Sequence, residues 1–150
     1  MTSNRWRVFL DTNVVIAGLL SRTGASAAIL DLGEAEEILP VVSRQVLVEA
    51  DRTVLAKFPQ LIERYRMFIR NLAPLLVEDP SAALVREAAT HIAPHDAPIL
   101  AAATAARADY LITLNTKHFL TPPVRAFCPC SILTPGEFLT AFRRFWEHAA

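Results

Sequence analysis

The sequence predicts an α/β fold in which helices cover both faces of a parallel β-sheet. Short, continuous apolar runs, typical of strands buried on both sides, alternate with longer segments whose apolar residues recur at helical spacing. No hairpin dipeptide such as Asn-Gly joins two of the apolar runs, so antiparallel pairing is not indicated. Hydrophobic residues make up 53% of the 150 residues, which excludes wholesale disorder. We expect a single domain over residues 1–150, folded around its own core.

Strands and helices alternate in the first half of the chain. Residues 8–10 are expected to form a short strand that ends at Asp11, and residues 38–42 the next strand. Ser43 is a favourable N-cap for a helix that runs to about residue 58. The other helices are expected at residues 14–20, 25–32 and 61–72.

The second half continues this alternation. Asp79 followed by Pro80 is a cap with proline at the first helical position, so a helix is expected to start there. Thr134 and Glu137 have the spacing of a capping box, which predicts the start of the last helix. The remaining elements are an alanine-rich helix at residues 95–108 and strands at residues 75–77, 110–113 and near 130–133.

Charge and cysteine content limit the partners and the compartment. Basic and acidic residues number 15 each, so a nucleic acid must be held by a local patch or by metal ions. Cys128 and Cys130 flank Pro129, and a disulfide across so short a spacing is strained; we expect reduced cysteines and a cytoplasmic protein. No uninterrupted apolar run approaches the ~20 residues that a membrane span needs, so no membrane partner is expected.

Acidic and amide side chains are expected where a parallel sheet binds ligands, at the carboxyl ends of its strands. Asp11 ends the first strand, Glu49 lies in the helix after the second, Asp96 caps the alanine-rich helix, and Asn115 follows the strand at 110–113. Carboxylates gathered in one place repel each other unless a cation lies between them, and Mg²⁺ prefers such oxygen ligands. Metal-ligand spacing is absent among the four histidines, His91, His95, His118 and His148.

Each of these positions also has a purely structural interpretation. Asp11 and Asp96 could serve only as helix caps, and Asn115 only as a turn residue. Glu49 falls on the polar side of its helix, where a solvated glutamate is common. Asp51 lies nearer the apolar stripe of the same helix and is a rival for the role of Glu49, unless it binds a neighbouring backbone group or an arginine.

Five segments of the sequence resemble, in order, the PIN-domain family of metal-dependent nucleases. The resemblance extends from residue 7 to about residue 140, although each segment is short. The segments are VFLDTNV at 8–14, VLVEA at 46–50, HDAPILAAA at 95–103, ADYLITLNTKHF at 108–119 and ILTPGEFL at 132–139, the last similar to the usual ending of bacterial members.

The resemblance implies a three-layer α/β/α sandwich with a parallel sheet of four or five strands. It also implies Mg²⁺- or Mn²⁺-dependent endonucleolytic cleavage of RNA. Many bacterial members of this size are VapC-like toxins of type II toxin–antitoxin pairs, so a cognate antitoxin is the implied protein partner, and a homodimer is expected.

The same resemblance assigns roles to individual residues. Asp11, Glu49 and Asp96 are the implied metal ligands and Asn115 the fourth, while the Thr113 hydroxyl would position a water or a ligand near the metal. Many relatives have aspartate where this chain has Asn115, so one negative charge is missing and a second ion is held less securely. Asp109 is assigned a structural role at the start of its strand.

Cationic and aromatic residues give a weaker indication of the RNA-binding surface. The cations nearest in sequence to the acids are Arg22, Arg44, Arg52, Lys117 and His118. Arg64, Arg66 and Arg70 could form a second patch, but a charged helix face is usually only solvated. The stripe of Phe138, Phe142, Phe145 and Trp146 is interpreted mainly as core packing, although it could serve a dimer or antitoxin interface.

Two other functions are compatible with the sequence. Asp11 at a strand end could be the nucleophile of a phosphatase, but such enzymes have a second aspartate two residues later, where Asn13 stands. The substitution at Asn115 also allows a catalytically weak or silent module that only binds RNA or protein.

Overall fold

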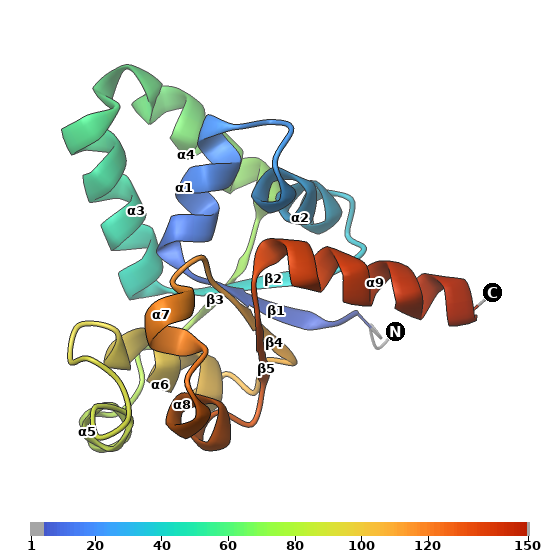
Figure 1. Cartoon of the computed structure of the whole chain (residues 1–150). Helices are drawn as coiled ribbons and strands as arrows, with labels where there is room; N and C mark the ends of the chain where they lie inside the picture. The colour runs from blue at the N-terminus through green and yellow to red at the C-terminus, as the bar shows by residue number, and fades with distance from the viewer. Residues whose placement is uncertain (1–4, 150) are drawn as a thin grey trace.

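Residues 5–149, which the computed structural model describes, contain a five-stranded sheet of order β3-β2-β1-β4-β5 (Figure 1). Every neighbouring pair of strands is parallel. Chain order therefore reverses between β1 and β4, which are adjacent in space, and this switch point is where open parallel sheets bind ligands. The strands are β1 (Arg7–Leu10), β2 (Leu39–Ser43), β3 (Leu75–Val77), β4 (Tyr110–Ile112) and β5 (Ser131–Leu133).

Helices cover both faces of the sheet, which confirms the predicted α/β/α layering (Figure 1). Coverage on both sides explains why Val8, Phe9 and Leu10 of the central strand are 0% exposed and form a continuous apolar run. One layer contains α1 (Thr12–Leu20), α2 (Ala25–Glu34), α3 (Arg44–Lys57), α4 (Ile62–Leu72) and α9 (Pro135–Ala149). The short helix η1 (Pro59–Leu61) directly precedes α4. The other layer contains α5 (Ala82–Ala88), α6 (Ala97–Ala105), α7 (Thr116–Phe119) and α8 (Pro122–Phe127).

Several helix boundaries differ by two or three residues from the sequence-based expectation, and hydrogen bonding or backbone conformation explains two of the differences. Helix α5 begins at Ala82, and not after Asp79, because the Ser81 hydroxyl caps it by accepting from the Leu84 N–H at 3.1 Å. Helix α6 ends at Ala105, since Arg107 adopts a left-handed φ of 54° that a helix cannot continue through. The short helices α7 and α8 were not predicted.

Cys128 and Cys130 form a disulfide, so the expectation of reduced cysteines was wrong. The chain bends at Pro129 and brings the two Cα atoms to 5.3 Å, within the range that a disulfide spans.

The last helix packs against the sheet through an aromatic cluster that supports the core interpretation of its stripe. Phe138 is 0% exposed and lies edge-on to Trp6 and Tyr110, with ring centroids 5.9 and 5.2 Å away. Phe145 and Trp146, near the end of the same helix, are 50% and 52% exposed, so core packing does not account for them fully.

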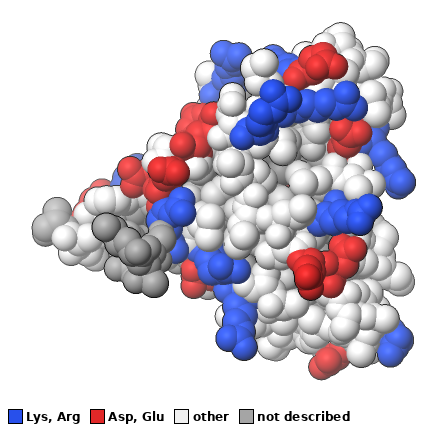
Figure 2. Space-filling model, turned by 180° about the vertical axis from the view of Figure 1, so that it is seen from behind, with Lys and Arg blue, Asp and Glu red and all other residues white. Residues whose placement is uncertain are grey.

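No single helix within residues 5–149 is long and apolar enough to cross a membrane. Helices α1 and α2 together have the length and composition of a membrane span, but they are bent by 96° relative to each other. The surface seen from behind in Figure 2 carries interspersed basic and acidic side chains, in keeping with the zero net charge.

Candidate active site

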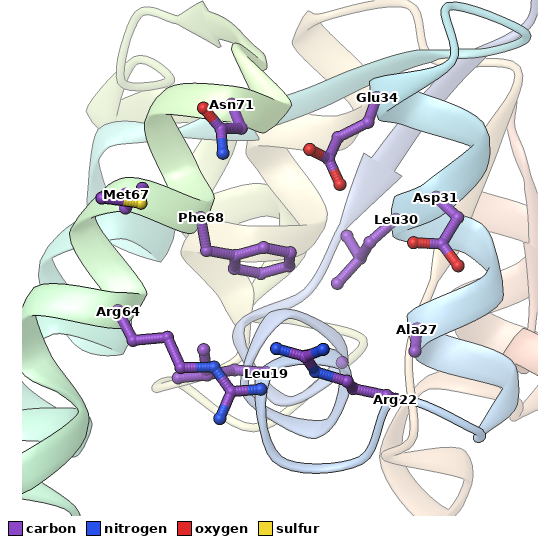
Figure 3. Close-up of a pocket in the computed structure, with 11 residues that line it drawn as sticks. Leu19, Arg22, Ala27, Leu30, Asp31, Glu34, Arg64, Met67, Phe68 and Asn71 are labelled. Carbon is purple, nitrogen blue, oxygen red and sulfur yellow. The ribbon is translucent and has the colours of Figure 1, made fainter.

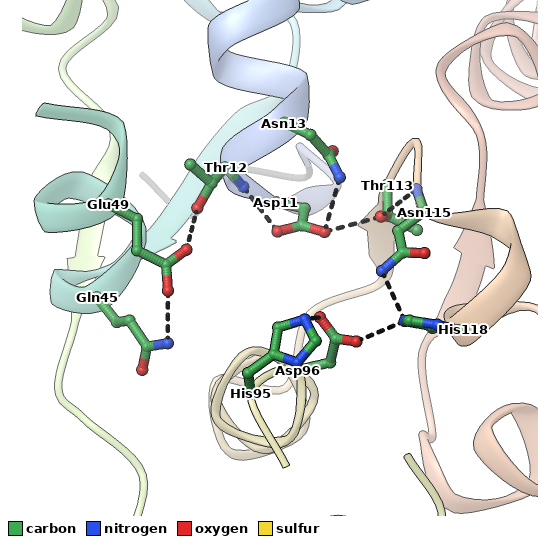
Figure 4. Close-up of polar contacts among 10 residues, drawn as sticks. All are labelled: Asp11, Thr12, Asn13, Gln45, Glu49, His95, Asp96, Thr113, Asn115 and His118. Carbon is green, nitrogen blue, oxygen red and sulfur yellow. Dashed lines mark hydrogen bonds and ion pairs between the residues drawn. The ribbon is translucent and has the colours of Figure 1, made fainter. Parts of the chain in front are cut away.

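Asp11 occupies the switch point of the sheet. It directly follows β1, and its backbone N–H donates to the Ile112 carbonyl at the end of β4 at 3.0 Å. Its side chain is buried and accepts from the Thr12 N–H at 2.7 Å, which caps α1. The other carboxylate oxygen accepts from the Thr113 hydroxyl at 2.8 Å and from the Asn13 amide at 3.3 Å (Figure 4). Asp11 is therefore a helix cap and also a carboxylate held at the edge where open parallel sheets bind ligands.

Burial raises the pKa of the Asp11 carboxyl above its usual value. The hydrogen bonds from Thr113 and Thr12 lower this pKa, while the negative charges of Asp96 and Glu49 raise it further. Two carboxylates from distant parts of the chain thus act electrostatically on Asp11. A cation would relieve this repulsion.

Glu49 is fixed towards Asp11 by hydrogen bonds and is not a freely solvated glutamate. From α3, its Oε2 accepts from the Thr12 hydroxyl at 3.0 Å and its Oε1 from the Gln45 amide at 2.8 Å (Figure 4). Thr12 therefore links Glu49 to Asp11, because its N–H binds one acid and its hydroxyl the other.

Asp51 faces a different part of the molecule from Glu49. Its carboxylate lies 3.7 Å from the Arg66 guanidinium of α4. Burial, and then the Asp51 charge, raise the pKa of Tyr65 to about 12. Asp51 therefore has the arginine partner considered from the sequence and belongs to the packing of α3 on α4.

Asp96 is at the N-cap position of α6, but its side chain makes no capping hydrogen bond. Capping alone therefore does not explain this buried carboxylate. Its Oδ2 lies 2.9 Å from Nδ1 of His118, and its Oδ1 lies 3.3 Å from Nε2 of His95 (Figure 4).

Thr113 connects the end of β4 to both Asp11 and Asn115. Its buried hydroxyl donates to Asp11 and accepts from the Asn115 N–H at 3.0 Å. The Asn115 amide nitrogen lies 3.4 Å from Nδ1 of His118. Asn13, which the sequence analysis did not assign to the site, accepts from the Leu114 N–H at 3.1 Å and so ties the two loops together.

The candidate RNA-binding cations are dispersed. Lys117 and His118 belong to α7, which begins directly after Asn115. Arg22 lines a cavity of about 390 Å³ between α1, α2 and α4, where Arg64 also lies and Asp31 and Glu34 stand across from them (Figure 3). Arg44 and Arg52 line a shallow hollow on α3 together with Asp51 and Arg66.

The side chains at the carboxyl ends of β1 and β4 have the donor atoms that a hard divalent cation prefers. Asp11, Glu49, Asp96 and the Asn115 amide all offer oxygen, and Mg²⁺ commonly binds through one or two carboxylates while keeping several waters. Within residues 5–149, the one group of three His, Cys, Asp or Glu residues whose donor atoms all lie within 4.8 Å of one another is His95, Asp96 and His118. Donor oxygens of Asp11, Glu49 and Asp96 therefore do not all lie within 4.8 Å of one another.

Asn in place of Asp11 should raise the melting temperature of the metal-free protein at pH 7. Because the pKa of Asp11 is higher in the folded than in the unfolded protein, protonation of Asp11 stabilises the fold. This stabilisation is fully present below the unfolded-state pKa of 3.8 and is lost as the pH rises through the folded-state pKa. The charged form is therefore destabilising at pH 7, and asparagine is always neutral. Thermal unfolding in EDTA measures this effect, with Asp51→Asn as the matched control. The increase in melting temperature for Asp11→Asn should shrink as the pH approaches 3.8. A lower melting temperature for Asp11→Asn at pH 7 would contradict the argument.

Comparison with known families identifies the sequence pattern. The family model described as a PIN domain matches residues 7–117, which is more than half of the chain. No curated protein sequence matches the chain significantly.

Solved structures with a similar fold are known. VapBC2 from Rickettsia felis, bound to a DNA fragment from its promoter, has a TM-score of 0.62 at 20% identity and covers 85% of this chain and 98% of its own. FitAcB from Neisseria gonorrhoeae has a TM-score of 0.60 at 23% identity, covering 85% and 97%. PAE2754 from Pyrobaculum aerophilum has a TM-score of 0.59 at 15% identity, covering 95% and 99%.

Proposed function

Because the chain belongs to the PIN-domain family, we propose that it is a divalent-metal-dependent endoribonuclease. The observation that carries this proposal is the buried Asp11 at the switch point, whose pKa is raised partly by the charges of Asp96 and Glu49. A buried carboxylate whose pKa is raised by neighbouring acids is typical of a functional site. A divalent cation between these acids would relieve their repulsion.

Mg²⁺ or Mn²⁺, when bound, would polarise the phosphodiester and activate a water molecule. Asp11, Glu49, Asp96 and the Asn115 amide oxygen would hold the ion, some of them through its water molecules, because the three carboxylates do not all lie within 4.8 Å of one another. Thr12 and Thr113 keep the carboxylates of Asp11 and Glu49 in place through the hydrogen bonds described above.

Lys117 would hold a flanking RNA phosphate, since it is exposed in α7 beside this edge. Sequence-independent phosphate contacts of this kind position an RNA without selecting its sequence.

The protein partner that we propose is a cognate antitoxin. VapBC2 and FitAcB, two of the similar structures, are toxin–antitoxin complexes. The chain would then be the VapC-like toxin of such a pair. The homodimer and the cytoplasmic location stay predictions, and the molecular mass in solution tests the first of them.

A cleavage assay on single-stranded RNA tests the proposed function. The purified chain should cut the RNA internally with Mn²⁺ or Mg²⁺ and should not cut it in EDTA. RNA binding without cleavage in either metal would instead support the silent RNA-binding module that Asn115 allows. Cleavage that is unaffected by EDTA would contradict a metal-dependent mechanism.

A further inference from the structure

Two histidines far apart in the sequence meet at Asp96. His95 precedes Asp96 at the start of α6, and His118 belongs to α7, 22 positions after Asp96 in the chain. One ring nitrogen of each histidine faces a different oxygen of the same carboxylate, at 3.3 and 2.9 Å (Figure 4). All three donor atoms lie within 4.8 Å of one another.

Structural stabilisation does not account well for this cluster. The side chains of His95 and His118 are 76% and 40% exposed, and ion pairs at such exposure contribute little to stability. The Asp96 side chain is only 11% exposed and makes no capping hydrogen bond to the helix that it begins. Both of its oxygens are thus committed to imidazoles that solvent, and therefore an ion, can reach.

We propose that His95, Asp96 and His118 form a binding site for a first-row transition-metal ion, with two nitrogen donors and one oxygen donor. Zn²⁺ with bonds of about 2.0–2.1 Å in a tetrahedral arrangement places neighbouring donors about 3.3 Å apart. His118 Nδ1 lies 2.9 Å from Oδ2 of Asp96 and His95 Nε2 lies 3.3 Å from Oδ1, so each nitrogen is close to this spacing from one carboxylate oxygen. One of these two oxygens would be the third donor, and the three donor atoms already lie within 4.8 Å of one another. Rotation of the exposed His95 ring supplies the remaining adjustment.

The donor set predicts which ions this site selects. Imidazole nitrogen suits Zn²⁺, Co²⁺ and Ni²⁺, whereas Mg²⁺ prefers oxygen ligands and retains its waters. Three protein ligands also leave a position open for water, as in catalytic zinc sites. The site shares Asp96 with the proposed nuclease centre, but its existence does not depend on RNA cleavage.

Calorimetric titration of the untagged, metal-free chain with Zn²⁺ tests the proposal. The wild type should bind one Zn²⁺ at this site, and at least about 100-fold more tightly than Mg²⁺. His95→Gln and His118→Gln should each weaken Zn²⁺ binding at least about 10-fold, as loss of a metal-site contact does. His148→Gln is the matched control, because His148 is an exposed histidine of α9 outside the cluster, and its affinity should equal that of the wild type.

A second readout uses Co²⁺, whose visible absorption changes with the ligands and geometry around the ion. The Co²⁺ bands of the wild type should disappear in His118→Gln and persist in His148→Gln. Wild-type Zn²⁺ affinity in both His95→Gln and His118→Gln, with folding verified by circular dichroism, would overturn the proposal.

Failure of this proposal is distinguishable from failure of the proposed function. Asp11→Asn should still give the Co²⁺ bands that depend on His118 while losing RNA cleavage, because Asp11 is outside the three-residue cluster. Zn²⁺ binding without any nuclease activity would reject only the nuclease, and metal-dependent cleavage without loss of Zn²⁺ affinity in the histidine variants would reject only this site.

Discussion

Replacing Asp11 by asparagine should lower the rate of metal-dependent RNA cleavage at least about 1,000-fold. A bound metal ion stabilises the transition state by several kcal/mol, and a 1,000-fold loss corresponds to ~4 kcal/mol of barrier. Asp11 is the buried acid on which both Asp96 and Glu49 act. Its replacement removes the central negative charge while asparagine keeps the shape of the side chain. Single-turnover cleavage of labelled RNA in Mn²⁺ measures the effect.

Asp51→Asn is the matched control for this experiment. Asp51 lies in the same helix as Glu49 but pairs with Arg66 at 3.7 Å, so its variant should cleave RNA at close to the wild-type rate. A loss for Asp11→Asn below about tenfold would show that Asp11 does not hold a catalytic ion. A large loss of cleavage rate for Asp51→Asn would show that Asp51, and not Glu49, is the metal-binding acid of α3.

Replacing Phe138 by alanine should reduce the free energy of unfolding by about 3–5 kcal/mol. Phe138 is 0% exposed and packs between Trp6, Tyr110 and Phe142, so alanine leaves a cavity between α9 and the sheet. This loss is a large fraction of the ~5–15 kcal/mol that stabilises a typical domain. Urea unfolding followed by circular dichroism measures it.

Phe145→Ala provides the comparison for that measurement. Phe145 belongs to the same helix and also contacts Trp6, but half of its side chain is exposed, so its loss should cost about 1 kcal/mol. Equal losses for the two variants would contradict the conclusion that Phe138 alone of this pair is part of the core.

Much of the fold was predictable because strong local signals agree with the tertiary structure. The apolar run before Asp11 is the central strand, and both hydrogen bonds of the capping box between Thr134 and Glu137 are present, at 2.9 and 3.2 Å. Helices α7 and α8, with four and six residues, are too short to show helical periodicity. The start of α5 was misplaced because two capping residues, Asp79 and Ser81, lie close together in the sequence.

The site was predictable where it depends on strand ends and not where it depends on tertiary contact. Asp11 and Thr113 follow neighbouring parallel strands, so the topology brings them together. The meeting of His95 and His118 at Asp96 depends on how α7 packs beside α6, and no sequence spacing encodes that approach. The absence of metal-ligand spacing among the histidines along the chain therefore does not exclude their meeting in space.

Crystals soaked in Mn²⁺ give the most direct test of whether Asp11, Glu49 and Asp96 share one divalent cation. We predict an anomalous difference peak at the end of β1, within bonding distance of Asp11 and of a second of these carboxylates. Crystals with ordered side chains at this edge and no peak there, at Mn²⁺ concentrations that support RNA cleavage, would contradict the account.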